Sequence, residues 1–461
     1  MPTKTLNELN HEAALSFYEK VYFEKWKNHC GELELIVSPK CNLACKYCYV
    51  KDFYHKTFPE ELYDASLTLT NFKKILNWLT KNYYYPHLDI FSGELLAQEI
   101  GYDILDMIYN HYSVLPEEER IPSVGIPTNF TFLCSEKYTN KIEDLIKKFN
   151  SLGIGLWLSA SFDGLHMEVN RPFVGDLDIP MGVKRDADYY EKVAAFCKKH
   201  GYGFHPMIYA ENIDKWPQNF DWFIDVMTRY EMPLDTLYLL EVRNAKWTNE
   251  QLQGFSKFLR HIFMWGWEYC KHDKVEFGRF IFKRNREKNY PMGWNILASP
   301  FSNRSNGISC NIQGGLTVRV ADLSLFPCHR TMYERFLLGN FVLNEEQEIE
   351  TLHCEHAELG MTIPMMNNNI SPRCLTCPIN ELCTGGCLGS QYENTKDLFT
   401  PIPTVCQLEL VKLYTLIDLF KEIDALDILL SSVAPGKKNQ LLAVINNNWE
   451  DYAHELNSES N

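Results

Sequence analysis

The sequence predicts an α/β protein in which six parallel strands alternate with helices as an open or partial barrel, followed by a small loop-rich domain and C-terminal helices. Three observations lead to this fold class. Short apolar or β-branched runs alternate with helix-like segments up to about residue 245, cysteine, proline and glycine become frequent between about 306 and 407, and helical periodicity then returns. Strands that alternate with helices favour a parallel sheet with right-handed crossovers.

The predicted elements follow the chain in a regular order. Residues 6 to 28 place apolar side chains at near-helical intervals and predict one amphipathic helix. Further helices are predicted at 69–83, 135–150, 186–201, 213–230, 408–430 and 437–457. Strands are predicted at 33–38, 87–92, 122–129, 155–163, 202–210 and 236–244. We therefore divide the chain into an N-terminal helix, a barrel, a connecting segment, a cysteine-rich domain and a C-terminal helical segment, with the ranges 1–30, 31–245, 246–305, 306–407 and 408–461.

The composition excludes several classes of partner. The chain has 461 residues, enough for two or three domains, and a formal charge of −15. Binding to phosphates needs a surplus of lysine and arginine, so neither nucleic acid nor an anionic membrane is expected as the main partner. The sequence lacks an uncharged apolar run long enough for a membrane span and lacks a secretory signal, so we expect a cytoplasmic protein. In a reducing compartment, its 15 cysteines favour metal ligation over disulfides.

Three cysteines follow the first predicted strand. Cys41, Cys45 and Cys48 have the spacing Cys-x3-Cys-x2-Cys and lie at the carboxyl end of that strand, where α/β folds place their ligand sites. Thiolates select zinc or iron–sulfur clusters, and three of them leave one corner of a metal group without a protein ligand. Such a corner is a place for substrate or cofactor. The alternative is three incidental or zinc-binding cysteines.

This stretch resembles the signature of the radical S-adenosylmethionine (SAM) superfamily, whose hallmark is the same spacing after the first strand of a partial (β/α)6 TIM-type barrel. The resemblance implies a [4Fe–4S] cluster held by Cys41, Cys45 and Cys48, with SAM chelating the fourth iron through its amino and carboxylate groups. It also implies an enzyme that cleaves SAM reductively to methionine and a 5′-deoxyadenosyl radical, which abstracts a hydrogen atom from the substrate. We assign no catalytic residue of the protein itself.

Other segments match SAM-contacting motifs of the same family. Serine replaces the first glycine of the family's Gly-Gly-Glu segment after the second strand, and Phe130 replaces the glycine of its Thr-Asn-Gly segment. A Ser-x-Asp-Gly…Arg pattern matches at the fourth strand. Ordinary strand-to-helix turns, a capping aspartate and a surface arginine are the alternative interpretation. The SAM contacts that the resemblance implies are Ser92, Gly93, Glu94, Asn129, Ser161, Asp163 and Arg171.

Three more polar residues of the predicted barrel have open roles. We expect His166 to be a satisfied loop histidine rather than a catalytic one. Glu241 and Arg243 end the sixth predicted strand, where a structural ion pair and a substrate contact are equally open. The segment 205–214 resembles the family's fifth-strand segment that ends in Asn-Ile-Asp, without individual roles.

A second cysteine pattern lies between residues 310 and 406. The spacing Cys-x2-Cys-x5-Cys-x3-Cys begins at residue 374, a further cysteine follows at 406, and two precede it at 310 and 328. Thiolates two or three residues apart can converge on one metal, and a pair of structural zinc sites is one interpretation. The pattern closely resembles the SPASM domain, which carries auxiliary iron–sulfur clusters in many radical SAM enzymes.

The SPASM resemblance implies two auxiliary [4Fe–4S] clusters and therefore three clusters in all. The implied ligands of auxiliary cluster I are Cys310, Cys328 and Cys387, and those of auxiliary cluster II are Cys374, Cys377, Cys383 and Cys406. Cluster I lacks the further cysteine of its fully ligated form, so it has an open iron or recruits a distant ligand, for which Cys354 is a candidate. We expect the remaining cysteines to be buried small hydrophobes, namely Cys30, Cys134, Cys197 and Cys270.

Several SPASM subfamilies act on peptides or proteins, so the resemblance implies a peptide or protein substrate. The leading interpretation is maturation of a ribosomally made peptide through a thioether or carbon–carbon crosslink, with an auxiliary cluster accepting the surplus electron. Sulfatase maturases, which form formylglycine on a protein, typically have Asp after the second auxiliary cysteine, where this chain has His329. Formylglycine formation is therefore an alternative. A non-catalytic iron–sulfur protein for electron transfer or scaffolding is another.

Two further partners are expected. A flavodoxin or ferredoxin would supply electrons for the cleavage of SAM. Few residues precede the first predicted strand, which leaves no room for the leader-peptide-binding domain that many such enzymes carry. We therefore expect leader recognition by a separate protein, by the C-terminal helices or by the connecting segment.

Overall fold

The computed structural model describes most of the chain and divides it into two compact units. The described residues are 6–50, 58, 62–285, 287–291, 294, 296–301, 315–354, 356–363, 371–383, 385–433 and 435–446. Unit one comprises Met1–Ser161, Glu168–Tyr202 and Cys310–Met366. Unit two comprises Phe162–Met167, Gly203–Ser309 and Asn367–Asn461.

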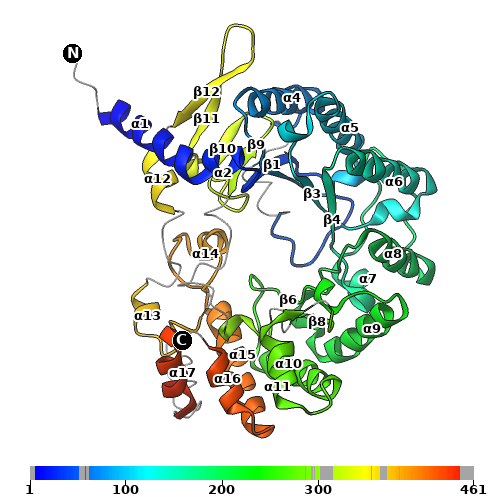
Figure 1. The fold of residues 1–461 in the computed structure, drawn as a ribbon, viewed down its shortest axis with the longest axis vertical. Coiled ribbons are helices and arrows are strands. Elements are labelled where there is room, and N and C mark those ends of the chain that lie inside the picture. The colour runs from blue at the N-terminus through cyan, green and yellow to red at the C-terminus, as the bar shows by residue number, and fades with distance from the viewer. Residues whose placement is uncertain are drawn as a thin grey trace. The chain divides into compact units, whose positions relative to one another are not determined.

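Unit one is built on an eight-stranded sheet with the order β12-β11-β10-β9-β1-β2-β3-β4 (Figure 1). Strand β1 pairs in parallel with β2 on one side and with β9 on the other, whereas β10, β11 and β12 continue the sheet as antiparallel strands. The carboxyl ends of β1 to β4 therefore lie along one edge. The strands are β1 Glu32–Ser38, β2 His87–Ser92, β3 Ser123–Thr128, β4 Gly155–Ala160, β9 Gly315–Arg319, β10 Ser324–Phe326, β11 Gly339–Leu343 and β12 Ile349–Cys354.

Helices follow the parallel strands of unit one and bury one face each. Helices α4, α5 and α6 pack side by side along the sheet (Figure 1). Asp64 caps α4 by accepting a hydrogen bond from the backbone N–H of Leu67, and Asp186 caps α8 in the same way. The helices are α1 Leu6–Tyr18, α2 Glu24–Lys27, α4 Ala65–Lys81, α5 Glu99–Ser113, α6 Glu136–Ser151, α8 Ala187–His200 and α12 Ala357–Thr362, with α7 Met167–Asn170 at a boundary between the units.

Unit two is mainly helical and holds the last two predicted barrel strands as a separate parallel pair, β5 Met207–Ile208 and β6 Leu240–Glu241. Strands β7 Arg284–Asn285 and β8 Tyr290–Pro291 form a small antiparallel pair. The helices are α9 Trp216–Arg229, α10 Asn249–Tyr269, α11 Lys274–Phe282, α13 Pro372–Leu375, α14 Leu388–Thr395, α15 Pro403–Glu422, α16 Leu426–Ser432 and α17 Pro435–Asn446. Among the described helices, none is both long enough and apolar enough to cross a bilayer.

The predicted fold class is confirmed, with differences in detail. All six predicted strands contain an observed strand, although the fifth and sixth are only two residues long. The predicted helix over 6–28 contains a π-helical segment, Glu19–Phe23, between α1 and α2. The predicted connecting segment includes the long helix α10, which packs against α15. The last part of the predicted 437–457 helix lies outside the described residues, and the division into five segments stays a prediction.

The cysteine-rich segment contributes regular strands that sequence periodicity did not indicate. Strands β9 to β12 belong to the range predicted as loop-rich, and they continue the sheet from β1. Helix α4 crosses to this part of the sheet, where the side-chain amide of Asn71 donates hydrogen bonds of 3.0 Å to the backbone carbonyls of Val320 and Ala321. These buried bonds join the first crossover helix to the turn between β9 and β10.

Replacing Asn71 with alanine should therefore destabilise unit one. Two buried carbonyl oxygens would lose their donor, which costs about 2–3 kcal/mol in the free energy of unfolding. Thermal and denaturant unfolding of the purified protein measures this effect. The matched control is Thr70→Ala, which removes an exposed hydroxyl on the same helix and should change stability by less than about 0.5 kcal/mol. Equal stability of the two variants would contradict the role given to Asn71.

Candidate functional site

The three clustered cysteines lie in a loop directly after β1. The backbone N–H of Cys48 donates to the carbonyl of Cys45, and the N–H of Leu43 approaches the Cys41 sulfur at 3.4 Å. Burial raises the pKa of the Cys41 thiol well above its ordinary value, and the charges of Glu94, Cys45 and Cys48 raise it further. The structure thus brings the three predicted thiols together with one carboxylate.

The cysteine loop is paired with the segment that carries Arg171. Backbone bonds of 2.9 Å join Ala44 to Pro172 and Lys46 to Asn170. The guanidinium of Arg171 lies 5.3 Å from the ring centroid of Tyr47, within cation–π range. Because Tyr47 stands between two of the clustered cysteines, Arg171 lies beside the loop.

A close backbone contact joins the ends of β1 and β2. The N–H of Gly93 donates to the carbonyl of Ser38, and the N–H of Glu94 donates to the carbonyl of Lys40, both at 2.9 Å. A Cβ atom at Gly93 would stand 2.3 Å from the Lys40 oxygen, so only glycine fits. Ser92 also contributes, since its hydroxyl donates to the Ser38 carbonyl at 2.8 Å. The serine that departs from the family motif therefore reinforces the contact.

The Glu94 carboxylate is buried and held from three sides. One oxygen accepts hydrogen bonds from the Leu96 N–H at 3.2 Å and the Thr128 hydroxyl at 2.8 Å. The other accepts from the Asn129 N–H at 2.6 Å. Burial raises the pKa of Glu94 to about 7, although these hydrogen bonds oppose the shift. The side chain can therefore hold either charge state near neutral pH, and a nearby cation would favour the carboxylate.

The third-strand segment contains a residue in a left-handed conformation. Phe130 has φ 61°, a region that favours glycine, and it replaces the glycine of the family motif. Its ring is buried against Phe132 and Phe196, which accounts for a large side chain at this position. Asn129 donates through its amide to the Asn42 side chain at 2.8 Å. The aromatic cluster thus accommodates a phenylalanine in a conformation that favours glycine.

Two polar residues of this network were not singled out from the sequence. Asn42 is buried and joins Asn129 to the Thr131 hydroxyl through hydrogen bonds of 2.8 and 2.9 Å. Thr128 donates to Glu94. Asn42 lies within the cysteine spacing and Thr128 precedes Asn129, so proximity to the motifs was the signal available in the sequence.

The fourth-strand motif is divided between the two units. Ser161 ends its part of unit one, and its N–H donates to the Thr128 carbonyl at 2.9 Å. Asp163 belongs to unit two, where its buried carboxylate accepts from the Met207 N–H at 3.0 Å. His166 is buried against Trp216, with ring centroids 5.6 Å apart. Burial lowers the pKa of His166, and its buried Nε2 has no hydrogen-bond partner among the described residues, so the expectation of a satisfied histidine fails at that atom.

Unit two contains a second group of thiols. Short helix α13 supplies Cys374 and the N-terminal turn of α15 supplies Cys406, and the Cys374 N–H donates to the Ser371 hydroxyl at 3.2 Å. Burial raises the pKa of Cys406 to about 11, with added contributions from the charges of Cys374 and Cys377. The charges of Cys406 and Cys377 likewise act on Cys383. The structure therefore places all four residues predicted for auxiliary cluster II near one another.

The thiol groups differ from the one compact set of possible metal ligands in the described part of the chain. Glu34, Cys328 and His329 have ligand atoms within 4.8 Å of one another, whereas neither set of predicted cysteine ligands forms such a group of three among the described residues.

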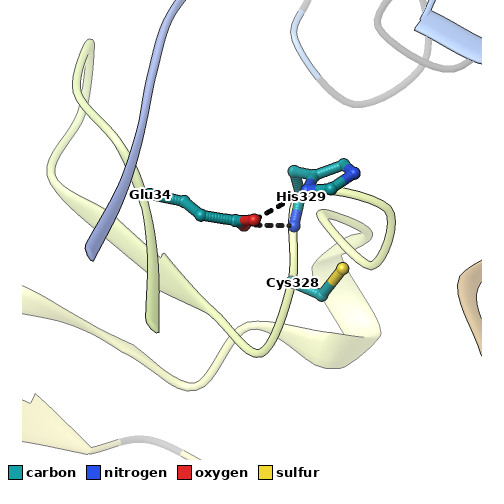
Figure 2. A group of neighbouring side chains, drawn as sticks. All are labelled: Glu34, Cys328 and His329. Atoms are coloured by element: carbon teal, nitrogen blue, oxygen red, sulfur yellow. Dashed lines mark hydrogen bonds and ion pairs between the residues drawn. The ribbon is translucent and has the colours of Figure 1, made fainter. Parts of the chain in front are cut away.

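Cys328 lies in a different setting, beside a histidine and a glutamate (Figure 2). His329 contacts Glu34 of β1 twice, through its ring Nδ1 at 3.0 Å and its backbone N–H at 3.2 Å. Its ring stacks on Phe91 with centroids 4.5 Å apart. Burial acts to raise the pKa of Glu34, but the charge and hydrogen bonds of His329 outweigh it and hold that pKa below its ordinary value. This imidazole is thus fixed on the sheet by a carboxylate partner.

The other cysteines differ in exposure. Cys197 and Cys270 are buried as expected, whereas Cys134 is only partly buried and the expectation for Cys30 is wrong. Cys30 is exposed because it lies in the turn after α2, ahead of the first strand. Cys354 is buried on β12, where its N–H donates to His11 of α1 at 3.2 Å. Cys310 lies outside the described residues, and Cys387 directly precedes α14.

Glu34 and Asp89 are register partners on β1 and β2, so two acidic side chains lie next to each other in the sheet. This arrangement predicts how the free energy of unfolding depends on pH. Burial raises the pKa of Asp89 from 3.8 to about 7, helped by the charges of Glu32 and Glu34. The folded protein therefore binds more protons than the unfolded chain between about pH 4 and pH 7, and this group lowers stability as pH rises through that window.

An Asp89→Asn variant should remove this contribution. Its free energy of unfolding should exceed that of the wild type by an amount that grows from pH 4 to pH 7 and then stays constant, at most of the order of 4 kcal/mol. Denaturant unfolding at a series of pH values measures the difference. Parallel stability profiles of the two proteins would contradict the raised pKa.

Comparisons with known proteins identify the fold. No protein-family model and no curated protein matches the sequence. The structure is similar to a His-tagged anaerobic sulfatase-maturating enzyme, anSMEcpe, with bound AdoMet, at 16% identity and a TM-score of 0.52 over 90% of this chain and 98% of that one. Native anSMEcpe with AdoMet gives 17% identity and a TM-score of 0.51 over 85% and 99% of the two chains. SuiB of Streptococcus suis with S-adenosylmethionine gives 13% identity and a TM-score of 0.45 over 86% and 78%. The chain therefore has the partial-barrel fold of the radical SAM enzymes.

Proposed function

We propose that this protein is a radical SAM/SPASM enzyme that uses a 5′-deoxyadenosyl radical to modify a peptide. The most specific reaction we propose is a thioether or carbon–carbon crosslink in a ribosomally made precursor. The observation that carries the SAM-dependent part is the position of Glu94. Its buried carboxylate follows the end of β2 by two residues and acts on Cys41, the first of the three clustered thiols.

The residues around the cysteine loop suit a bound SAM molecule. The group held by Cys41, Cys45 and Cys48 would be a [4Fe–4S] cluster that supplies the electron for SAM cleavage. Glu94 would accept hydrogen bonds from the cationic amino group of SAM, and such charge-assisted bonds are about twice as strong as neutral ones. The fold likeness to AdoMet-bound structures supports this assignment. Ser92, Gly93, Asn129, Ser161, Asp163 and Arg171 remain the proposed further SAM contacts.

The second group of thiols would hold an iron–sulfur cluster suited to electron transfer. The closeness of Cys374, Cys377, Cys383 and Cys406, whose charges act on one another, supports auxiliary cluster II. Cluster I, with Cys310, Cys328 and Cys387, remains a proposal that rests on the SPASM resemblance. Two auxiliary clusters could accept the electron left over when a crosslink forms. We propose flavodoxin or ferredoxin as the external donor and a separate leader-peptide-binding protein as a further partner.

Formylglycine formation is the second candidate, because the similar structures include a sulfatase-maturating enzyme. This chain has His329 after Cys328 instead of aspartate, and the histidine is paired with Glu34. The crosslinking proposal is preferred for that reason. Mass spectrometry of a peptide treated with the enzyme separates the two reactions. A crosslink joins two residues in the fragment spectrum, whereas formylglycine carries an aldehyde that reacts with a hydrazide probe.

Removal of the three clustered thiols should abolish SAM cleavage. A variant with Cys41→Ala, Cys45→Ala and Cys48→Ala should form no 5′-deoxyadenosine when reduced, because no cluster remains to donate the electron. Liquid chromatography measures this product, and iron analysis of the same sample should still detect the auxiliary clusters. Unchanged turnover would refute the assignment. A fully iron-loaded wild type that forms no 5′-deoxyadenosine would favour the non-catalytic alternative.

Glu94→Gln should weaken SAM binding. The amide lacks the negative charge that would pair with the SAM amino group, and losing a hydrogen bond to a charged group costs about 1.5–3 kcal/mol, or roughly 10- to 100-fold in Kd. Equilibrium binding to the reconstituted protein measures the change. The matched control is Glu99→Gln, an exposed glutamate at the start of α5, which should keep wild-type affinity. Equal affinity of all three proteins would contradict the role of Glu94.

A further inference from the structure

Four charged side chains meet in the interior of unit two. Glu241 ends β6 and Arg243 follows it, while Glu409 and Lys412 lie one turn apart on α15. Lys412 Nζ donates to Glu241 at 2.9 Å and to Glu409 at 2.6 Å. The side chains of Glu241, Glu409 and Lys412 are only 1–2% exposed. The ion pair left open by the sequence is therefore part of a network of two positive and two negative charges, of which only the Arg243 side chain is partly exposed, at 27%.

The network fixes the orientation of the Arg243 guanidinium. Its Nε and Nη2 donate to one oxygen of Glu241 at 3.0 and 2.7 Å, and Nη2 also donates to Glu409 at 2.9 Å. Burial acts against the charge, but Glu241 and Glu409 outweigh it and raise the pKa of Arg243 above its ordinary value. Planar guanidinium groups keep a fixed fork geometry, so binding one edge determines where the other edge points.

The other edge of Arg243 reaches the loop between two predicted cluster ligands. Nη1 donates to the carbonyl of Gly385 at 3.3 Å, and the N–H of Gly385 approaches the Cys383 sulfur at 3.3 Å. Gly385 has φ 72°, a left-handed conformation that turns its two polar groups in these directions. The charge of Cys383 contributes to the raised pKa of Arg243, which places the two charges within electrostatic range.

We propose that Arg243 is a positioning residue that sets the reduction potential of the group held by Cys383, through its own charge and through the Gly385 N–H. This inference rests on the proposed function, since that group would be auxiliary cluster II. Potentials of iron–sulfur clusters depend on net charge and on hydrogen bonds to the sulfurs, and both effects of Arg243 stabilise the more negative, reduced state. The buried carboxylates and Lys412 keep the guanidinium charged and in place.

The experiment compares reduction potentials in a protein that lacks the SAM-binding cluster. The parent protein carries Cys41→Ala, Cys45→Ala and Cys48→Ala. A further Cys383→Ala substitution identifies the signal of auxiliary cluster II as the one that it removes from the electron paramagnetic resonance spectrum. A dithionite titration of that signal should give a more negative midpoint potential for Arg243→Gln than for the parent. Arg260→Gln is the matched control. Arg260 pairs at the surface with Glu422, which lies on α15 as Glu409 does. The midpoint potential of this variant should equal that of the parent.

A second variant separates electrostatics from loosened structure. Glu409→Gln keeps the shape of the side chain and removes a negative charge that acts on both Cys383 and Cys406, so it should shift the midpoint in the positive direction. A general loosening of the loop would move both variants the same way. If Arg243→Gln fails to retain iron, Arg243→Lys replaces it, and its midpoint should fall on the negative side of the parent because the lysine loses the forked contact.

The outcomes distinguish this inference from the proposed function. Parent protein without any iron–sulfur signal would refute auxiliary cluster II itself. A normal parent signal with an unchanged midpoint in the arginine variant, or with shifts of the same sign in the arginine and glutamate variants, would overturn the role of Arg243 alone. Opposite shifts, with iron content equal to the parent, support it.

Discussion

The backbone contact between the ends of β1 and β2 is the constraint on which the candidate site depends. Gly93 and Glu94 donate their N–H groups to the carbonyls of Ser38 and Lys40, directly before Cys41. The contact is so close that a Cβ atom at Gly93 would overlap the Lys40 carbonyl. Parallel pairing of the two strands carries their ends to one edge of the sheet, and this contact determines where both the first thiol and the carboxylate lie.

Two glutamates of unit one show how partners decide the chemistry of a buried carboxylate. Glu94 receives neutral donors and its pKa is raised to about 7 by burial, whereas Glu34 faces His329 and its pKa is held below the ordinary value. Desolvation disfavours the charge in both places, but at Glu34 the charge and hydrogen bonds of His329, together with the Thr317 hydroxyl, outweigh it. The partners around each carboxylate therefore decide the direction of its pKa shift.

Buried charge plays a different part in unit two. Burying an ion pair is costly unless several hydrogen bonds compensate, and the network of Glu241, Arg243, Glu409 and Lys412 supplies such bonds at every member. Its cost is understandable if it holds a guanidinium beside the loop of Cys383. The same arrangement ties the end of β6 to α15, the helix that supplies Cys406, so one network supports both a barrel strand and the second thiol group.

Local patterns in the sequence determined the elements and the thiol sets. The alternation of apolar runs with helix-like segments located all six barrel strands, and cysteine spacings of two to five residues located the thiols of both groups apart from Cys406, because neighbours in sequence are neighbours in space. Long-range pairing was beyond such patterns. The strands β9 to β12, the hydrogen bonds from Asn42 and Thr128, and the joining of Arg243 to Glu409 all depend on residues far apart in the chain.

The same division explains the individual departures from the family motifs. The sequence alone marked Ser92 and Phe130 as substitutions, but it could not show whether the backbone tolerates these two residues. It also predicted that Cys30 is buried. The tertiary structure decided these points: the Ser92 hydroxyl bonds to Ser38, Phe130 keeps a left-handed φ within an aromatic cluster, and Cys30 lies exposed in a turn. Composition and spacing determine which residues can do chemistry, whereas burial and partners arise only when distant segments pack together.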